Sequence, residues 1–118
     1  MGMNEPIIHI KNMKRYRGAG TYVGRPSVLG NPFEIGRDGG RDEVIQKYRT
    51  WLEERLESDN ATSQAFVALF DEMCAGKELI LICFCAPKKC HAEVIREFLL
   101  QAWEEKQRKE DYHQGQSR

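Results

Sequence analysis

The chain lacks any apolar run that approaches the roughly 20 residues a membrane-spanning helix needs. Its first residues are polar, and the apolar stretch that follows them is too short for a secretory signal. Met1-Gly2 does not begin a myristoylation motif, because Pro6 stands where serine or threonine is required. We therefore predict a cytoplasmic protein that has no membrane partner.

The chain also lacks a net charge, since 18 basic residues balance 18 acidic ones. A dedicated nucleic-acid-binding domain carries a clear basic excess, so nucleic acid is not the partner that we expect. The charges are unevenly placed, however. No acid occurs between Pro6 and Phe33, a stretch that contains Lys11, Lys14, Arg15, Arg17 and Arg25. This local excess favours an anionic small-molecule ligand, although a solvated basic surface has the same composition.

Without an export signal, the four cysteines are expected in a reducing compartment, where disulfides are rare and metal binding, catalysis or burial are the alternatives. The hydrophobic share of 41% and the charged share of 31% are typical of a globular domain. We predict a single domain over residues 1–106. Residues 107–118 are charged and polar without periodicity, which predicts a flexible C-terminal tail.

Apolar periodicity predicts an α/β fold. Two short runs rich in β-branched residues, at 7–10 and 21–23, indicate short strands. A third strand is predicted at 78–83, where the uninterrupted apolar run at 79–82 indicates a strand covered on both faces. Helical spacing of apolar residues predicts three helices, at 41–56, 63–75 and 90–106. This order favours a small, mainly parallel sheet with three helices, in a Rossmann-like three-layer or two-layer arrangement.

The segment at residues 83–91, CFCAPKKCH, holds three of the four cysteines and predicts a strand-to-helix turn. Ligands of open α/β folds bind beyond the carboxyl ends of strands, and a helix N-terminus favours anions. A thiol placed there beside two lysines should ionise readily. Cys90 is therefore our candidate nucleophile or ligand contact and His91 our candidate acid or base, with Cys85 and Lys88 as candidate ligand contacts.

Two other interpretations of this turn stay open. Cys83, Cys85, Cys90 and His91 form a possible zinc set, although their spacing differs from that of paired zinc knuckles and adjacent Cys90 and His91 are an awkward chelating pair. Alternatively, the cysteines are purely structural, with Cys90 as a neutral helix cap. We favour a pocket without metal or cofactor, and we expect no stoichiometric zinc.

A second unusual segment is the loop at residues 24–33, GRPSVLGNPF. It belongs to a long glycine-rich connection, and such loops are often functional. Arg25 carries a planar charged fork that suits phosphate or carboxylate, and Ser27 and Asn31 are polar groups able to orient a ligand. A rigid turn whose Arg25 caps a helix C-terminus would explain the same residues.

Taken together, GRPSVLGNPF and CFCAPKKCHAEVI resemble the signature of a family of uncharacterised bacterial and phage proteins, classed as a domain of unknown function. The resemblance covers residues 22–99. It implies that the two motifs belong to one site on one fold, but it implies no reaction.

We therefore predict that the two motifs meet at one end of the sheet, where Arg25, Asn31, Cys85, Cys90 and His91 line a cleft. The leading hypothesis is an enzyme or sensor that binds or processes a nucleotide-like or other phosphorylated small molecule. The alternative is a non-enzymatic module that binds zinc or a partner. The sequence leaves the substrate, the reaction and the oligomeric state undefined.

Overall fold

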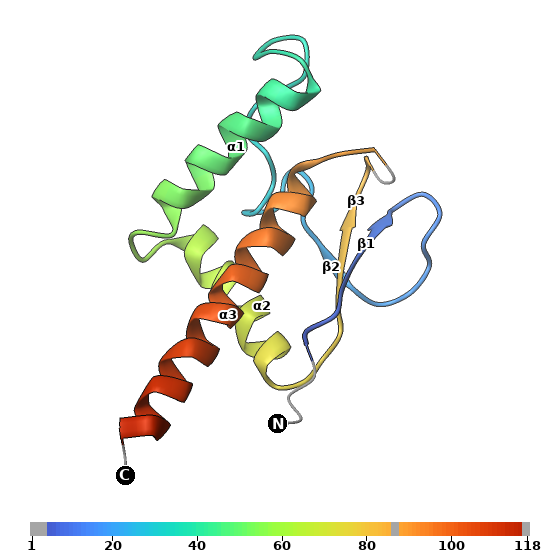
Figure 1. Cartoon of the computed structure of the whole chain (residues 1–118). Coiled ribbons are helices and arrows are strands. Elements are labelled where there is room, and N and C mark those ends of the chain that lie inside the picture. The colour runs from blue at the N-terminus through green and yellow to red at the C-terminus, as the bar shows by residue number, and fades with distance from the viewer. Residues whose placement is uncertain (1–4, 86–87, 117–118) are drawn as a thin grey trace.

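The computed structural model describes residues 5–85 and 88–116, and only the backbone of residues 111–116. Along the chain, the elements are β1 (Ile8–Asn12), β2 (Thr21–Tyr22), α1 (Arg41–Arg55), α2 (Ala61–Cys74), β3 (Leu79–Cys83) and α3 (His91–Gln116). The protein is thus a small α/β fold with three helices, as the sequence predicts (Figure 1).

The three strands form one sheet in the order β1-β3-β2, and both outer strands run parallel to β3. Ile8 lies opposite Leu79 at one end of the pairing, and Asn12 lies opposite Cys83 at the other. Because all three strands point the same way, their carboxyl ends share one edge of the sheet. The loop after β2 and the β3–α3 turn both begin at this edge.

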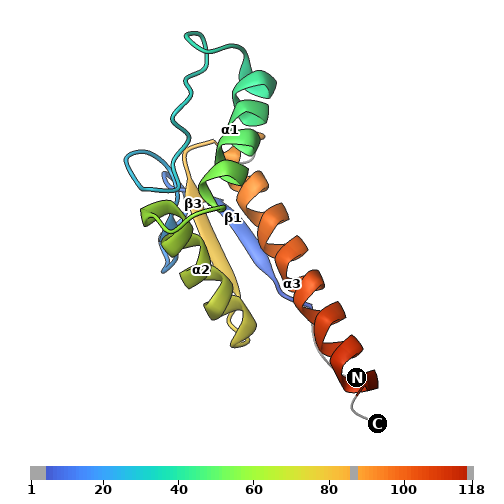
Figure 2. The ribbon, with the colours of Figure 1, turned by 90° about the vertical axis from the view of Figure 1, so that its left-hand side faces the viewer.

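The helices cover one face of the sheet, so the arrangement has two layers (Figures 1 and 2). Side chains of β3 alternate accordingly: Leu79, Leu81 and Cys83 are buried in the helix-covered core, whereas Ile80 and Ile82 are only partly buried. The expectation of a strand covered on both faces is therefore wrong for the second face, where Ile80 and Ile82 are only partly buried. No described helix covers the second face (Figure 1), and Gly20, just before β2, lies beside Ile80, since an added Cβ would meet the Ile80 carbonyl oxygen at 2.9 Å.

The core lies between the sheet and the helices. It receives one apolar stripe from each helix: Val44, Tyr48 and Leu52 from α1, Phe66, Leu69 and Met73 from α2, and Val94, Ile95 and Leu99 from α3. Burying each of the larger aliphatic side chains contributes about 1.5–3 kcal/mol to stability. Periodic apolar residues therefore explain both the presence of the helices and the faces that they bury.

Helix α3 continues to Gln116, well past the predicted end at Lys106. The polar segment that the sequence suggested as a flexible tail is therefore helical as far as it is described, and residues 117–118 lie outside the described part of the chain. Lys106 and Glu110 form an ion pair one helical turn apart, which supports a helix that buries little apolar surface. No helix among the described residues is long and apolar enough to cross a membrane.

Candidate ligand-binding site

A pocket of about 460 Å³ lies at the carboxyl edge of the sheet. Its walls come from the loop after β2, the start of α1 and the β3–α3 turn, which are far apart in the sequence and adjacent in the fold (Figure 1). Five residues that we predicted for one cleft all line it: Arg25, Asn31, Cys85, Cys90 and His91. The other two predicted contacts, Ser27 and Lys88, are not among its lining residues.

Short turns position Arg25 at the mouth of this pocket. The Val23 amide donates to the Ile82 carbonyl oxygen (2.9 Å), which continues the β2–β3 pairing one residue beyond β2. The Tyr22 hydroxyl then donates to the Arg25 carbonyl oxygen at 2.6 Å. Glycine suits position 30, because a Cβ there would stand 3.0 Å from the Arg25 amide nitrogen and would crowd the backbone. The loop is therefore a compact structure folded back on the strand end.

Two hydrogen bonds anchor the same loop on α1. The Asn31 side chain donates to the Val44 carbonyl oxygen (3.2 Å) and accepts from the Phe33 amide (2.9 Å). The buried Tyr48 hydroxyl donates to the Leu29 carbonyl oxygen at 2.7 Å. Asn31 therefore shapes the pocket wall, whether or not it also touches a ligand.

Ser27 has a different environment from the one that the sequence suggested. Its hydroxyl oxygen is buried and has no hydrogen-bond partner among the described residues. Its backbone closes the two turns of the loop, accepting from the Gly30 amide and donating to the Gly24 carbonyl oxygen. Ser27 thus belongs to the framework of the loop.

The Cys90 thiol is buried, with 4% of the residue exposed. Its sulfur lies 3.4 Å from the Cys83 sulfur and 3.4 Å from the Ala92 amide nitrogen, which donates to it. The hydrogen bond with Cys83, followed by burial, raises the pKa of Cys90 above its ordinary value. The expectation of an easily ionised thiol is therefore wrong, because the sulfur points into the core and loses the water that would stabilise a thiolate.

His91 forms part of the pocket base and is 7% exposed. Its Nε2 lies 2.6 Å from the Val23 carbonyl oxygen, and its ring meets Tyr48 edge-on at 5.1 Å between centroids. A carbonyl oxygen can only accept, so Nε2 carries the proton and Nδ1 keeps the lone pair of the neutral ring. Burial, assisted by the charge of Arg25, lowers the pKa of His91 and favours this neutral form.

Basic side chains outnumber acidic ones around the pocket. Arg25, Arg41 and Lys89 line it together with a single acid, Glu34, and Arg25 contacts that acid at 3.5 Å. The Arg41 guanidinium donates to the Lys89 carbonyl oxygen at 2.9 Å, which brings the start of α1 onto the β3–α3 turn. Within the described residues, neither Arg41 nor Lys89 forms an ion pair with a carboxylate. Both charges remain available to an anion.

Apolar groups occupy the remaining surface of the pocket. Phe84 is 52% exposed and meets Tyr22 edge-on at 5.9 Å between ring centroids. Ile35 is 53% exposed on the opposite loop, and Phe33 lies beside it in the lining. Sequence reasoning missed these residues and Arg41. The motif GNPF and the CFC turn contained the signal for Phe33 and Phe84, whereas a helix-initial arginine has no distinctive pattern.

The same turn offers little to a metal ion. Within residues 5–85 and 88–110, no group of three or more His, Cys, Asp or Glu side chains is placed to hold one. Of the four possible zinc ligands, Cys83 and Cys90 adjoin each other, and His91 uses Nε2 on the Val23 carbonyl oxygen.

Comparison with known proteins gives a family without an assigned activity. No curated protein and no solved structure matches the chain. A family model described as a domain of unknown function, DUF4326, matches residues 8–101. This range includes all three strands, both motif segments and the whole pocket lining. The chain therefore belongs to the DUF4326 family of domains of unknown function.

Proposed function

We propose that the pocket at the carboxyl edge of the sheet binds a nucleotide-like phosphorylated small molecule. The observation that carries this proposal is the combination of three cationic side chains, Arg25, Arg41 and Lys89, with exposed aromatic surface at Phe84 in one cavity. Guanidinium groups suit phosphate oxygens, and an exposed aromatic ring suits a flat, partly apolar ring. A volume of about 460 Å³ is adequate for a ligand of this size.

The phosphate is held by side chains in this proposal, and the helix N-terminus contributes less than the sequence suggested. In the first turn of α3, the Ala92 amide donates to the Cys90 sulfur and the Glu93 amide to the Cys90 carbonyl oxygen. These donors are already used. Arg41 and Lys89 extend from the same region and supply the positive charge instead.

In this proposal, His91 contacts the ligand through its Nδ1 atom. A neutral imidazole with Nε2 fixed on a carbonyl can accept a hydrogen bond or a proton at Nδ1. If the ligand is a substrate, His91 is the group we assign as base. We assign Cys90 no nucleophilic role, because its thiol is buried and its pKa is raised. Cys90 instead stabilises the β3–α3 turn through its contacts with Cys83 and the Ala92 amide.

Calorimetric titration tests the proposal with AMP, GMP, CMP, UMP, ribose 5-phosphate and inorganic phosphate as probes. Arg41→Met should weaken the binding of each nucleotide that binds by about tenfold, which corresponds to the lower end of about 1.5–3 kcal/mol for a charge-assisted hydrogen bond. Arg17→Met, a matched change outside the pocket lining, should leave binding unchanged. Phe84→Ser should weaken the binding of nucleotides more than the binding of ribose 5-phosphate, which has no base. Absence of binding by every probe, or equal effects of the two arginine variants, would refute the proposal.

One observation favours a second candidate, a zinc-binding module. The sulfurs of Cys83 and Cys90 lie 3.4 Å apart, so two thiol ligands are already neighbours. We still expect no stoichiometric zinc, because no group of three or more possible ligands among the described residues is placed to hold a metal ion, and adjacent Cys90 and His91 are an awkward chelating pair. Elemental analysis of the dialysed protein decides between the two. Near-equimolar zinc that is lost in Cys83→Ser would favour the module.

A further inference from the structure

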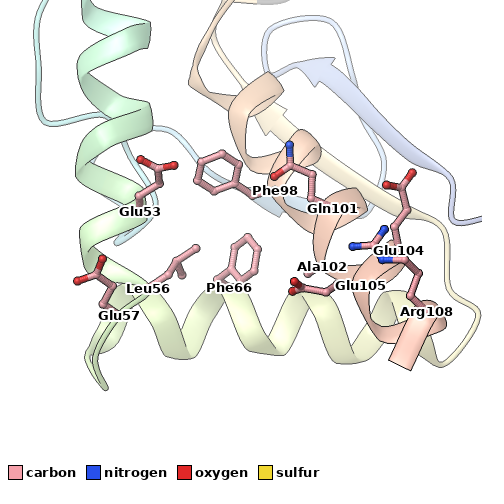
Figure 3. Close-up of a pocket in the computed structure, with 10 residues that line it drawn as sticks. All are labelled: Glu53, Leu56, Glu57, Phe66, Phe98, Gln101, Ala102, Glu104, Glu105 and Arg108. Atoms are coloured by element: carbon pink, nitrogen blue, oxygen red, sulfur yellow. The ribbon is translucent and has the colours of Figure 1, made fainter. Parts of the chain in front are cut away.

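A second cavity, of about 760 Å³, opens between the end of α1, the start of α2 and the middle of α3 (Figure 3). We call it the helical groove. It lies on the three helices, whereas the ligand pocket lies at the sheet edge, and the two cavities share no lining residue. The helical groove therefore needs an explanation of its own.

The floor of the helical groove is apolar. Phe66 rises from α2, and Leu56 and Phe98 converge on it from α1 and α3 (Figure 3). Phe98 is only partly buried, and the Arg49 guanidinium lies 5.8 Å from its ring centroid. Arg49 is itself fixed by two hydrogen bonds to Glu97, at 2.6 and 2.9 Å. The floor is thus an apolar surface in which Leu56 and Phe98 are partly exposed and Phe66 is buried.

The walls of the helical groove are acidic. Glu53 lines it from α1 and Glu57 from the turn after α1, and Glu104 and Glu105 line it from α3. The lining contains a single cation, Arg108. Within the described residues, none of the four carboxylates forms an ion pair. Exposed acids elsewhere on α3 differ in this respect, since Glu97 and Glu110 both have basic partners. Negative charge is therefore concentrated on both sides of an apolar floor.

We propose that the helical groove docks a basic amphipathic helix of a partner protein. Such a helix presents an apolar stripe to the partly exposed Leu56 and Phe98 and cationic flanks to Glu57 and Glu105 on the two walls. Two turns of a helix about 10 Å wide occupy roughly 850 Å³, which is similar to the volume of the cavity. Nucleic acids and anionic membranes are excluded, because the acidic walls repel them.

The test uses a synthetic 18-residue peptide of leucine and lysine with helical amphipathic spacing, labelled for fluorescence anisotropy. We expect saturable one-to-one binding that weakens as salt is raised, because the contacts at the walls are screened. Glu57→Lys combined with Glu105→Lys reverses one charge on each wall and should weaken binding at least tenfold. Asp71→Lys combined with Glu72→Lys makes the same change in charge on the exposed side of α2 and should weaken it less than threefold.

Two further probes separate a built groove from simple charge attraction. A scrambled peptide of the same composition keeps the charge and loses the apolar stripe, and spermine keeps only the charge. Both should bind at least tenfold more weakly than the amphipathic peptide. Equal binding of either probe, equal loss in the two double variants, or no binding of the amphipathic peptide would overturn the proposal. Nucleotide titration of the same variants should be unaffected, which keeps this result separate from the ligand pocket.

Discussion

Mild acid should destabilise the fold through His91. In the folded protein burial lowers the pKa of this imidazole, and the nearby Arg25 charge lowers it further. In the unfolded chain the group titrates near its ordinary pKa of about 6.5. Below that pH the unfolded state binds more protons than the folded state, so acid favours unfolding. The contribution of His91 to stability is complete above about pH 6.5 and is lost as the pH falls toward the lowered folded-state pKa.

The size of this effect follows from the linkage relation. Each pH unit between the two pKa values removes up to about 1.4 kcal/mol of unfolding free energy. For a chain of 118 residues, about 1 kcal/mol corresponds to a change in Tm of about 4 °C. The expected loss in Tm is therefore about 6 °C per pH unit at most. It arises because protonation at Nδ1 would add a charge to a ring that is buried and already bonded through Nε2.

Differential scanning calorimetry from pH 8 to pH 5 measures this loss. His91→Gln removes the titrating group and keeps an amide donor for the Val23 carbonyl oxygen, so its Tm should depend much less on pH. His9→Gln is the matched control, because His9 is exposed beside Glu78. Glu97 also has a lowered pKa, owing to its hydrogen bond with Arg49, but its stabilisation is lost near pH 4 and below and is common to all three proteins. Equal slopes for His91→Gln and the native protein would refute the reasoning.

Two further predictions concern groups beneath the pocket. Tyr48→Phe leaves the buried Leu29 carbonyl oxygen without its donor. The free energy of unfolding, measured in urea, should fall by about 1–3 kcal/mol with an unchanged m value. An unaltered midpoint would contradict this prediction. In native protein treated with iodoacetamide, Cys74 and Cys85 should be modified before Cys90, because the Cys90 sulfur is buried. Peptide mass spectrometry over time gives the order, and early modification of Cys90 would show that the turn opens readily.

The helices were predictable because each has a regular apolar stripe, and tertiary packing buries that stripe. Two features of the fold could not be predicted from apolar periodicity. A run such as Leu79-Ile80-Leu81-Ile82 looks the same whether its second face is covered by a helix or only by a loop. The end of α3 was also missed, because an exposed polar helix carries no apolar period, and pairs such as Lys106–Glu110 are weak signals.

The place of the pocket was predictable, but the chemistry of its thiol was not. Two motifs rich in glycine, cysteine and asparagine indicated loops at strand ends, and parallel strands bring such loops to one edge. The ionisation of Cys90 depends instead on which way its sulfur points. One residue before α3, it turns toward Cys83 and away from the lysines. Burial then outweighs the helix dipole, a balance that residue spacing alone does not reveal.

The pocket thus combines buried, uncharged residues at its bottom with charged residues at an exposed rim. This division decides which variants report on ligand binding. His91 lines the pocket, and Tyr48 packs against it from outside the lining. Both are buried and are bonded to the backbone that shapes the wall. Changes there alter stability and pocket shape together. Arg25 and Arg41 belong to the rim, where truncation removes charge and leaves the core packing intact, but truncation of Arg41 also removes its hydrogen bond to the Lys89 carbonyl oxygen. Lost affinity in a rim variant whose Tm is unchanged therefore reports on the ligand contact alone, and rim variants are the ones that should be measured first.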